Sequence, residues 1–227
     1  MRVVPSFRGC VFATATVAAA AFAPLASAQV YITEWMYNGN GGTGEYVEFT
    51  NLGTSAVDFS GWSFDDDSRN SGTVSLSAFG LVNPGESVIL TEASASEFRS
   101  VWNLSNSVDV VGNNSTNLGR ADEINLYDGA GNLVDRLTYG DNAIPGSIRA
   151  QNISGNPLGL DVLGANNALG WIFASVGDVY GSYIDLNNVD LGNPGTFALA
   201  PVPLPAAAWL LLSGVAGLLG FRRKSLV

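Results

Sequence analysis

The chain has 227 residues with 20 acidic and 10 basic side chains, no histidine and one cysteine. Between the apolar terminal segments 1–28 and 201–227, residues 29–200 keep all 20 acids but only five arginines, a formal charge of −15, which disfavours binding to nucleic acid phosphates. Without histidine, and with its cysteine in segment 1–28, the chain cannot form a Ser-His-Asp triad, a zinc site with histidine or cysteine ligands, or an intrachain disulfide.

Residues 1–28 follow the order of a secretory signal peptide. Two arginines precede an apolar stretch, and the segment closes on small residues that include Ala26 and Ala28. We expect a signal peptidase to cut after Ala28 and to leave Gln29 as the first exported residue. The alternative, a buried helix of the following domain, does not account for the Ala-x-Ala ending.

The segment after Gln29 is predicted to form short strands separated by turns. Residues 30–36 are rich in β-branched and aromatic side chains. Polar and apolar residues alternate through 45–50, so Val47 and Phe49 are expected on one face and Glu48 on the other. Similar strands are predicted at 57–59, 61–64, 74–76 and 87–91.

Farther along the chain, the strands 123–127 and 133–139 flank a glycine-rich segment, which predicts a β-hairpin with a five-residue loop. One short helix is expected at 93–102. After Pro145 the pattern weakens, and only 171–173 and 180–184 are expected as strands. Many short strands with almost no helix predict an all-β fold, a β-sandwich.

These segments occur in an order that resembles the lamin-tail domain. The series comprises 32–38, 44–51, 57–62, 81–86, the hairpin at 123–139, Trp171 and 192–195. The resemblance implies one immunoglobulin-like β-sandwich over 29–200. It departs from the family at 103–119 and 147–170, which are either loops elaborated for a partner or tolerated insertions.

Four residues in or next to this series have simple structural interpretations. Trp62 is predicted to fill the space between the two sheets, since a large aromatic side chain buries much area there. Gly53, Gly85 and Gly195 are predicted to adopt positive φ in turns.

Acidic residues supply the only candidate chemistry. Asp65, Asp66 and Asp67 form the densest run, and oxygen ligands suit Ca²⁺. Arg69 and Asn70 interrupt the spacing of a calcium loop, so a solvated loop is the competing interpretation, and the sequence predicts no cofactor other than this candidate Ca²⁺.

Glu34, Glu45 and Glu48 are candidate carboxylates for glycoside hydrolysis. Glu45 and Glu48 are three residues apart on one strand, so their side chains should point to opposite faces and cannot flank one bond. No catalytic residue is therefore predicted.

The segment 201–227 is predicted to be a membrane anchor. Prolines give an extended lead-in, and the uncharged residues 206–221 would rise about 24 Å as a helix, short of a roughly 30 Å hydrocarbon core. Extension to Leu204 and snorkelling of the basic end close this gap, which gives a transmembrane helix at about 204–221. The basic end places the tail inside and the domain outside; it consists of Arg222, Arg223 and Lys224.

The same tail resembles the VPLPA variant of the PEP-CTERM sorting signals. The recognition motif is matched by Val202, Pro203, Leu204 and Pro205, followed by the apolar helix and the basic end. In that family an exosortase, an integral-membrane cysteine protease or transpeptidase of Gram-negative bacteria, cuts the tail, and the cargo is usually linked to exopolysaccharide and biofilm. The better-known form has Glu at the position of Leu204, which leaves the exosortase subtype open.

The sequence thus predicts a non-enzymatic module that is exported, held in the inner membrane and then moved to the cell surface or the extracellular matrix. Its expected partners are exopolysaccharide or surface proteins. The competing hypothesis is a carboxylate-based hydrolase of extracellular polymers, assisted by Ca²⁺, which requires two acids converging in one cleft. A third idea, tethering of partner proteins, is not separable from the first by sequence.

Overall fold

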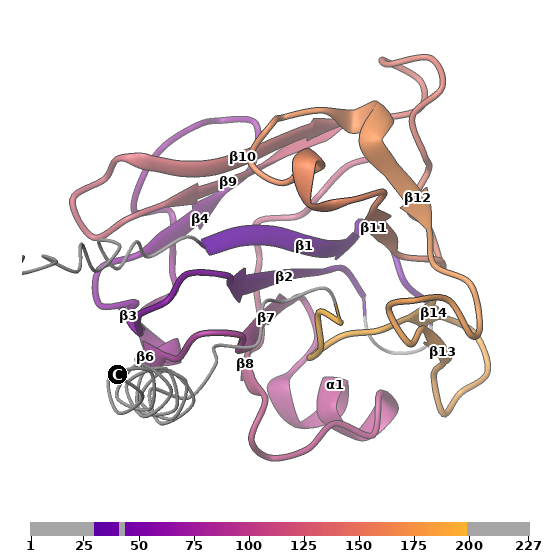
Figure 1. The fold of residues 1–227 in the computed structure, drawn as a ribbon, viewed down its shortest axis with the longest axis horizontal. Helices are drawn as coiled ribbons and strands as arrows, with labels where there is room; N and C mark the ends of the chain where they lie inside the picture. The colour runs from indigo at the N-terminus through magenta and orange to yellow at the C-terminus, as the bar shows by residue number, and fades with distance from the viewer. Residues whose placement is uncertain (1–29, 41–43, 199–227) are drawn as a thin grey trace, which may run out of the picture.

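The computed structural model describes residues 30–40 and 44–198 (Figure 1). The predicted signal peptide and the predicted sorting tail lie outside the described residues. Within the described ranges, no helix has the length and apolar character needed to cross a membrane.

Two β-sheets packed face to face confirm the predicted sandwich (Figure 1). The larger sheet has the order β12 (Trp171–Phe173), β11 (Gly155–Pro157), β1 (Val30–Met36), β2 (Tyr46–Asn51), β7 (Ser87–Thr91), β8 (Asp109–Val111). The smaller has the order β10 (Leu133–Tyr139), β9 (Asp122–Tyr127), β4 (Ser63–Asp65), β5 (Val74–Ser75). Neighbouring strands are antiparallel except β7 and β8, which are parallel.

Shorter elements complete the described part. Two ribbons pair β3 (Val57–Asp58) with β6 (Leu81–Val82), and β13 (Tyr183–Ile184) with β14 (Leu191–Gly192). The helix α1 (Ala95–Val101) lies where a short helix is predicted, and three 3₁₀ turns occupy Ser77–Phe79, Leu160–Val162 and Ala168–Gly170. Ser94 caps α1, since its side chain accepts a hydrogen bond from the Glu97 N–H.

The main core lies between the two sheets. Phe49 from β2 and Leu126 from β9 are fully buried there, and the Trp35 ring lies 4.0 Å from that of Tyr139. Trp62 does not fill this space as predicted. It is half-buried at the margin of the core with its ring 4.5 Å from that of Phe59, because its place before β4 leaves one face in solvent.

The outer face of the larger sheet carries a second apolar cluster beneath α1. Its buried members are Met36, Tyr46, Ile89, Phe98 and Trp102. The alternation predicted for β2 is confirmed, because Val47 and Phe49 belong to the inner core while Tyr46 belongs to this outer cluster.

A β-bulge in β1 sets which side chains share the outer face. Ile32 pairs with Phe49, but Glu34 pairs with Glu48, so Thr33 is the extra residue. The Ile32 N–H donates a 2.9 Å hydrogen bond to the Asp135 carboxylate of β10. The bulge thus places Glu34 directly opposite Glu48.

Both segments that depart from the family series contribute strands to the larger sheet. Segment 103–119 contains β8, and segment 147–170 contains β11. At the turns, Gly85 and Gly195 have φ of 82° and 89°, as predicted. The prediction is wrong for Gly53, which is not among the positive-φ residues. Its N–H instead donates to the Asn51 side chain, and this side-chain turn does not require positive φ at position 53.

Candidate binding site

Buried polar side chains fill part of the outer face of the larger sheet. The Thr33 hydroxyl donates to Glu48 Oε1 at 2.7 Å, and the Thr50 hydroxyl is hydrogen-bonded to that of Ser87 at 2.8 Å. These side chains come from β1, β2 and β7, and all four are buried. A buried polar layer of this kind is stable only if its members are hydrogen-bonded.

Residues 192–196, called the closing segment here, lie over this layer and are fixed by two carboxylates. The Asn193 N–H donates to Glu34 Oε1 at 2.7 Å, and the Gly195 N–H donates to Glu48 Oε2 at 2.7 Å. The hydroxyl of Ser154, the residue immediately before β11, donates to Glu34 Oε1 at 2.5 Å. One carboxylate from each of two adjacent strands therefore holds the backbone that closes the fold.

These two carboxylates have no counter-charge. Both residues are 0% exposed, and the ion pairs within the described ranges involve other residues. Burial and the neighbouring Glu48 raise the pKa of Glu34 to about 8. Burial also raises the pKa of Glu48, against the lowering effect of its hydrogen bonds. At neutral pH the pair therefore retains at least one proton.

The geometry gives these acids a structural role. Glu34 and Glu48 come together, which the sequence patterns did not predict, and neither is exposed. Glu34 Oε1 and both carboxylate oxygens of Glu48 accept hydrogen bonds from the protein itself, whereas Glu34 Oε2 has no hydrogen-bond partner among the described residues. Glu45 lies apart from them, where it accepts from Asn114 Nδ2 at 3.1 Å and from the Leu118 N–H at 2.5 Å. Burial raises its pKa to about 8. The expected separation of Glu45 from Glu48 is therefore correct, and none of the three pockets described among residues 30–40 and 44–198 is lined by Glu34, Glu45 or Glu48.

The aspartate run lies on the smaller sheet. Asp65 is buried, and its Oδ2 accepts from Ser68 Oγ and the Asn70 N–H at 2.8 and 2.7 Å. Asp66 is half-buried and Asp67 is exposed. Among the described residues, no group of three acidic side chains is arranged to hold a metal ion.

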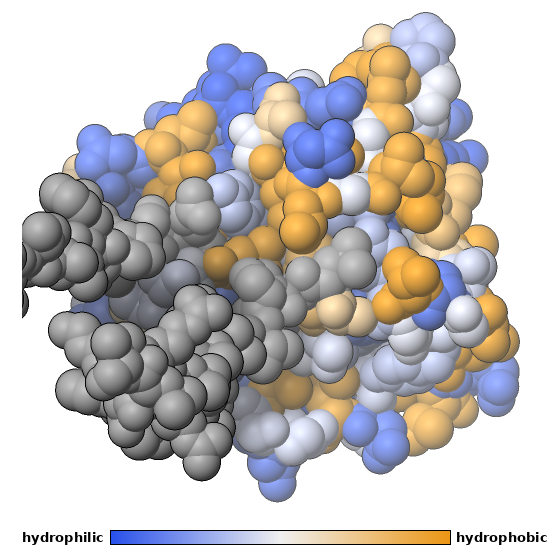
Figure 2. Space-filling view, in the orientation of Figure 1, coloured by the Kyte–Doolittle hydropathy of each residue, from blue (hydrophilic) through white to orange (hydrophobic). Residues whose placement is uncertain are grey.

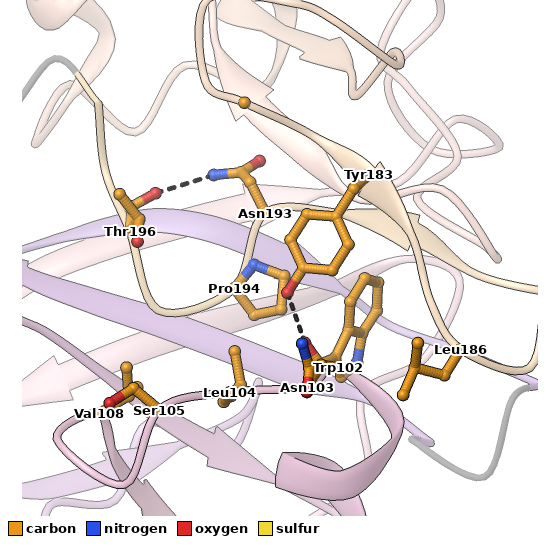
Figure 3. Close-up of a pocket in the computed structure, with 11 residues that line it drawn as sticks. Trp102, Asn103, Leu104, Ser105, Val108, Tyr183, Leu186, Asn193, Pro194 and Thr196 are labelled. Atoms are coloured by element: carbon orange, nitrogen blue, oxygen red, sulfur yellow. Dashed lines mark hydrogen bonds between the residues drawn. The ribbon is translucent and has the colours of Figure 1, made fainter.

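A pocket of about 480 Å³ opens between the end of α1 and the closing segment (Figure 3). One wall is formed by 102–108 and the other by parts of 181–196. Tyr183 joins the walls by donating from its hydroxyl to the Trp102 carbonyl at 2.8 Å. Sequence reasoning did not find this pocket, because its walls come from loops about 80 residues apart, which are brought together by tertiary packing.

Apolar side chains are exposed on and beside β12, the edge strand of the larger sheet (Figure 2). Ile172 and Phe173 are 40% and 45% exposed, and Leu158 and Leu169 are 67% and 58% exposed. Clustered apolar exposure of this kind is common at protein interaction surfaces.

The residues predicted for processing lie outside the described ranges. They are Ala26, Ala28, Gln29, Val202, Pro203, Leu204, Pro205, Arg222, Arg223 and Lys224.

Comparison with known proteins identifies the fold family. The family model of the lamin tail domain matches residues 23–141. The matched range includes the strands from β1 to β10 and α1, and it ends before β11, β12 and the closing segment. No curated protein and no solved structure matches the chain. The match covers just over half of the 227 residues and shows that the chain belongs to the lamin tail domain family.

Proposed function

We propose that this chain is a non-enzymatic interaction module that is exported and then assembled at the cell surface or in the extracellular matrix of a Gram-negative bacterium. In this proposal, a signal peptidase removes residues 1–28, the helix at about 204–221 holds the chain in the inner membrane, and an exosortase-type enzyme processes the tail at the Val202–Pro205 motif. The module then binds exopolysaccharide or surface proteins.

The membership of the lamin tail domain family carries the proposal, since these immunoglobulin-like β-sandwiches serve as structural or interaction modules. The export steps are supported by the sequence patterns at both ends. The binding role is supported by the exposed apolar side chains beside β12 and by the pocket at the closing segment.

The burial of Glu34 and Glu48, the two acids that lie directly opposite each other, counts against a hydrolase. Glu34 and Glu48 are buried and bind the closing segment, whereas a glycosidase needs two carboxyl groups that flank a substrate bond.

Retention on matrix material tests the proposal. The protein recovered from producing cells is passed over immobilised exopolysaccharide and over outer-surface protein fractions from the same cells. We expect retention on at least one fraction, without release of sugar or peptide products. Absence of retention on every fraction, or product release abolished by Glu34→Gln, would refute the binding module.

A further inference from the structure

The pocket between α1 and the closing segment is preformed. Besides the Tyr183 bond to Trp102, the Leu186 N–H donates to the Val101 carbonyl at 2.9 Å, which ties the loop after β13 to the end of α1. On the other side, Asn193 accepts from Asn156 Nδ2 and Ser182 Oγ and donates to the Thr196 carbonyl. A ligand would therefore enter a pocket whose walls are already ordered, which lowers the entropic cost of binding.

Two polar groups at the rim have no partner within the described ranges. The Asn103 side chain is exposed on one wall, where a φ of 48° turns the chain at the end of α1. The Thr196 hydroxyl is exposed on the opposite wall. An amide and a hydroxyl each both donate and accept hydrogen bonds. The half-buried ring of Tyr183 also lines the pocket and is held edge-on to Trp102 with the ring centres 5.5 Å apart (Figure 3).

The pocket is also uncharged. No described residue that lines it is acidic or basic, although the domain carries a formal charge of −15. An anionic ligand would meet the negative field of the domain without a basic partner, and a cation would find no carboxylate in the lining. The volume of about 480 Å³ falls in the range of small-molecule sites.

We propose that this pocket binds a short stretch of a neutral, hydroxyl-rich polymer, that is, an uncharged polysaccharide. Sugar hydroxyls both donate and accept, which matches Asn103 and Thr196, and the apolar face of a sugar ring packs on an aromatic ring such as Tyr183. A peptide strand would instead pair along a sheet edge, whereas these walls, apart from Tyr183 of β13, are formed by loops and by the residues that follow α1. This inference rests on the proposed binding role and names its ligand class and site.

Titration calorimetry on the full chain tests the assignment, in a detergent without a sugar headgroup. The probes are maltohexaose and cellohexaose, which are neutral, and a hexamer of galacturonic acid, which is anionic. We expect at least one neutral hexamer to bind and the anionic hexamer to bind more weakly. The double variant Asn103→Gly, Thr196→Val should raise the Kd about tenfold, since it removes two modest hydrogen bonds. Glycine tolerates the positive φ at 103, and both positions are exposed, so the variant should fold.

The control is Asn113→Gly, at another exposed asparagine with positive φ (61°) that does not line the pocket, and its Kd should be unchanged. The assignment is overturned if neither neutral hexamer binds, if the anionic hexamer binds more tightly, or if the double variant binds as the parent does. If the double variant is still retained on exopolysaccharide, the proposed function stands and only the assignment of the binding site to this pocket is rejected.

Discussion

The carboxylate pair beneath the closing segment predicts a specific dependence of stability on pH. The folded chain keeps a proton on Glu34 up to about pH 8, whereas an ordinary glutamate loses it near pH 4.5. Between these values the unfolded chain binds fewer protons than the folded chain. The free energy of unfolding is therefore largest below about pH 4.5 and falls as the pH rises toward 8.

This one group lowers the free energy of unfolding by up to about 1.4 kcal/mol per pH unit, or about 5 kcal/mol over the whole window. Glu34→Gln removes the titration and keeps an oxygen that can accept from Asn193 and Ser154. Between pH 6 and 8 we expect the wild type to lose up to about 3 kcal/mol more than the variant. Glu45 and Asp135 also have raised pKa values, but they are present in both proteins and cancel in the difference.

Urea unfolding of the full chain at pH 5, 6, 7 and 8, followed by tryptophan fluorescence, measures this difference. Glu97→Gln is the matched control for the substitution itself, because it makes the same change at an exposed position of α1, away from the buried carboxylates. Equal slopes for wild type and Glu34→Gln, or a steeper slope in the variant, would show that Glu34 is not held protonated by burial in the folded chain.

Three further changes have predictable effects on stability. Gly195→Ala should destabilise the fold by about 1–3 kcal/mol and speed amide exchange in the closing segment, because φ is 89° and the new Cβ would lie 3.0 Å from Val108. The same change in the open turn at Gly85 should cost only about 1 kcal/mol, since nothing lies near its Cβ position. Equal losses at the two positions would argue against close packing at Gly195. Ser94→Ala should lower the free energy of unfolding by about 1 kcal/mol in the same urea assay, and no loss would show that the cap is dispensable. Arg69 holds the pKa of Glu123 down to about 2, which adds stability that is lost as the pH falls from about 4.5 to 2. In this range the free energy of unfolding of Arg69→Ala should therefore fall less steeply with acid than that of the wild type. Identical acid titrations would exclude this ion pair as the cause.

Local patterns were sufficient to predict most strands. Alternation identified the faces of β2, and the glycine-rich loop between β9 and β10 identified the hairpin, because both signals are local in sequence. β11 was missed because it is three residues long and contains glycine and proline, which are rare in strands. β8 was missed because its segment is rich in asparagine and serine.

The candidate site was less predictable because it depends on register and on distant contacts. Without the bulge at Thr33, the pairing of Ile32 with Phe49 would bring Glu34 opposite Val47 and turn it to the other face. No residue type in β1 specifies such a bulge. The closing segment was recognised as a turn, but its contacts with Glu34 and Glu48 span 159 and 147 residues, a separation that no sequence periodicity reports.

Terminal mass measurement combined with cell fractionation shows whether the chain is exported and processed at both ends. We expect a mature chain that begins at Gln29, ends near the Val202–Pro205 motif, and lies in the surface or matrix fraction of the producing cells. Replacing Pro203 and Pro205 with alanine should keep the unprocessed tail in the inner membrane fraction. A chain that carries both original ends and remains in the cytoplasm would contradict the account.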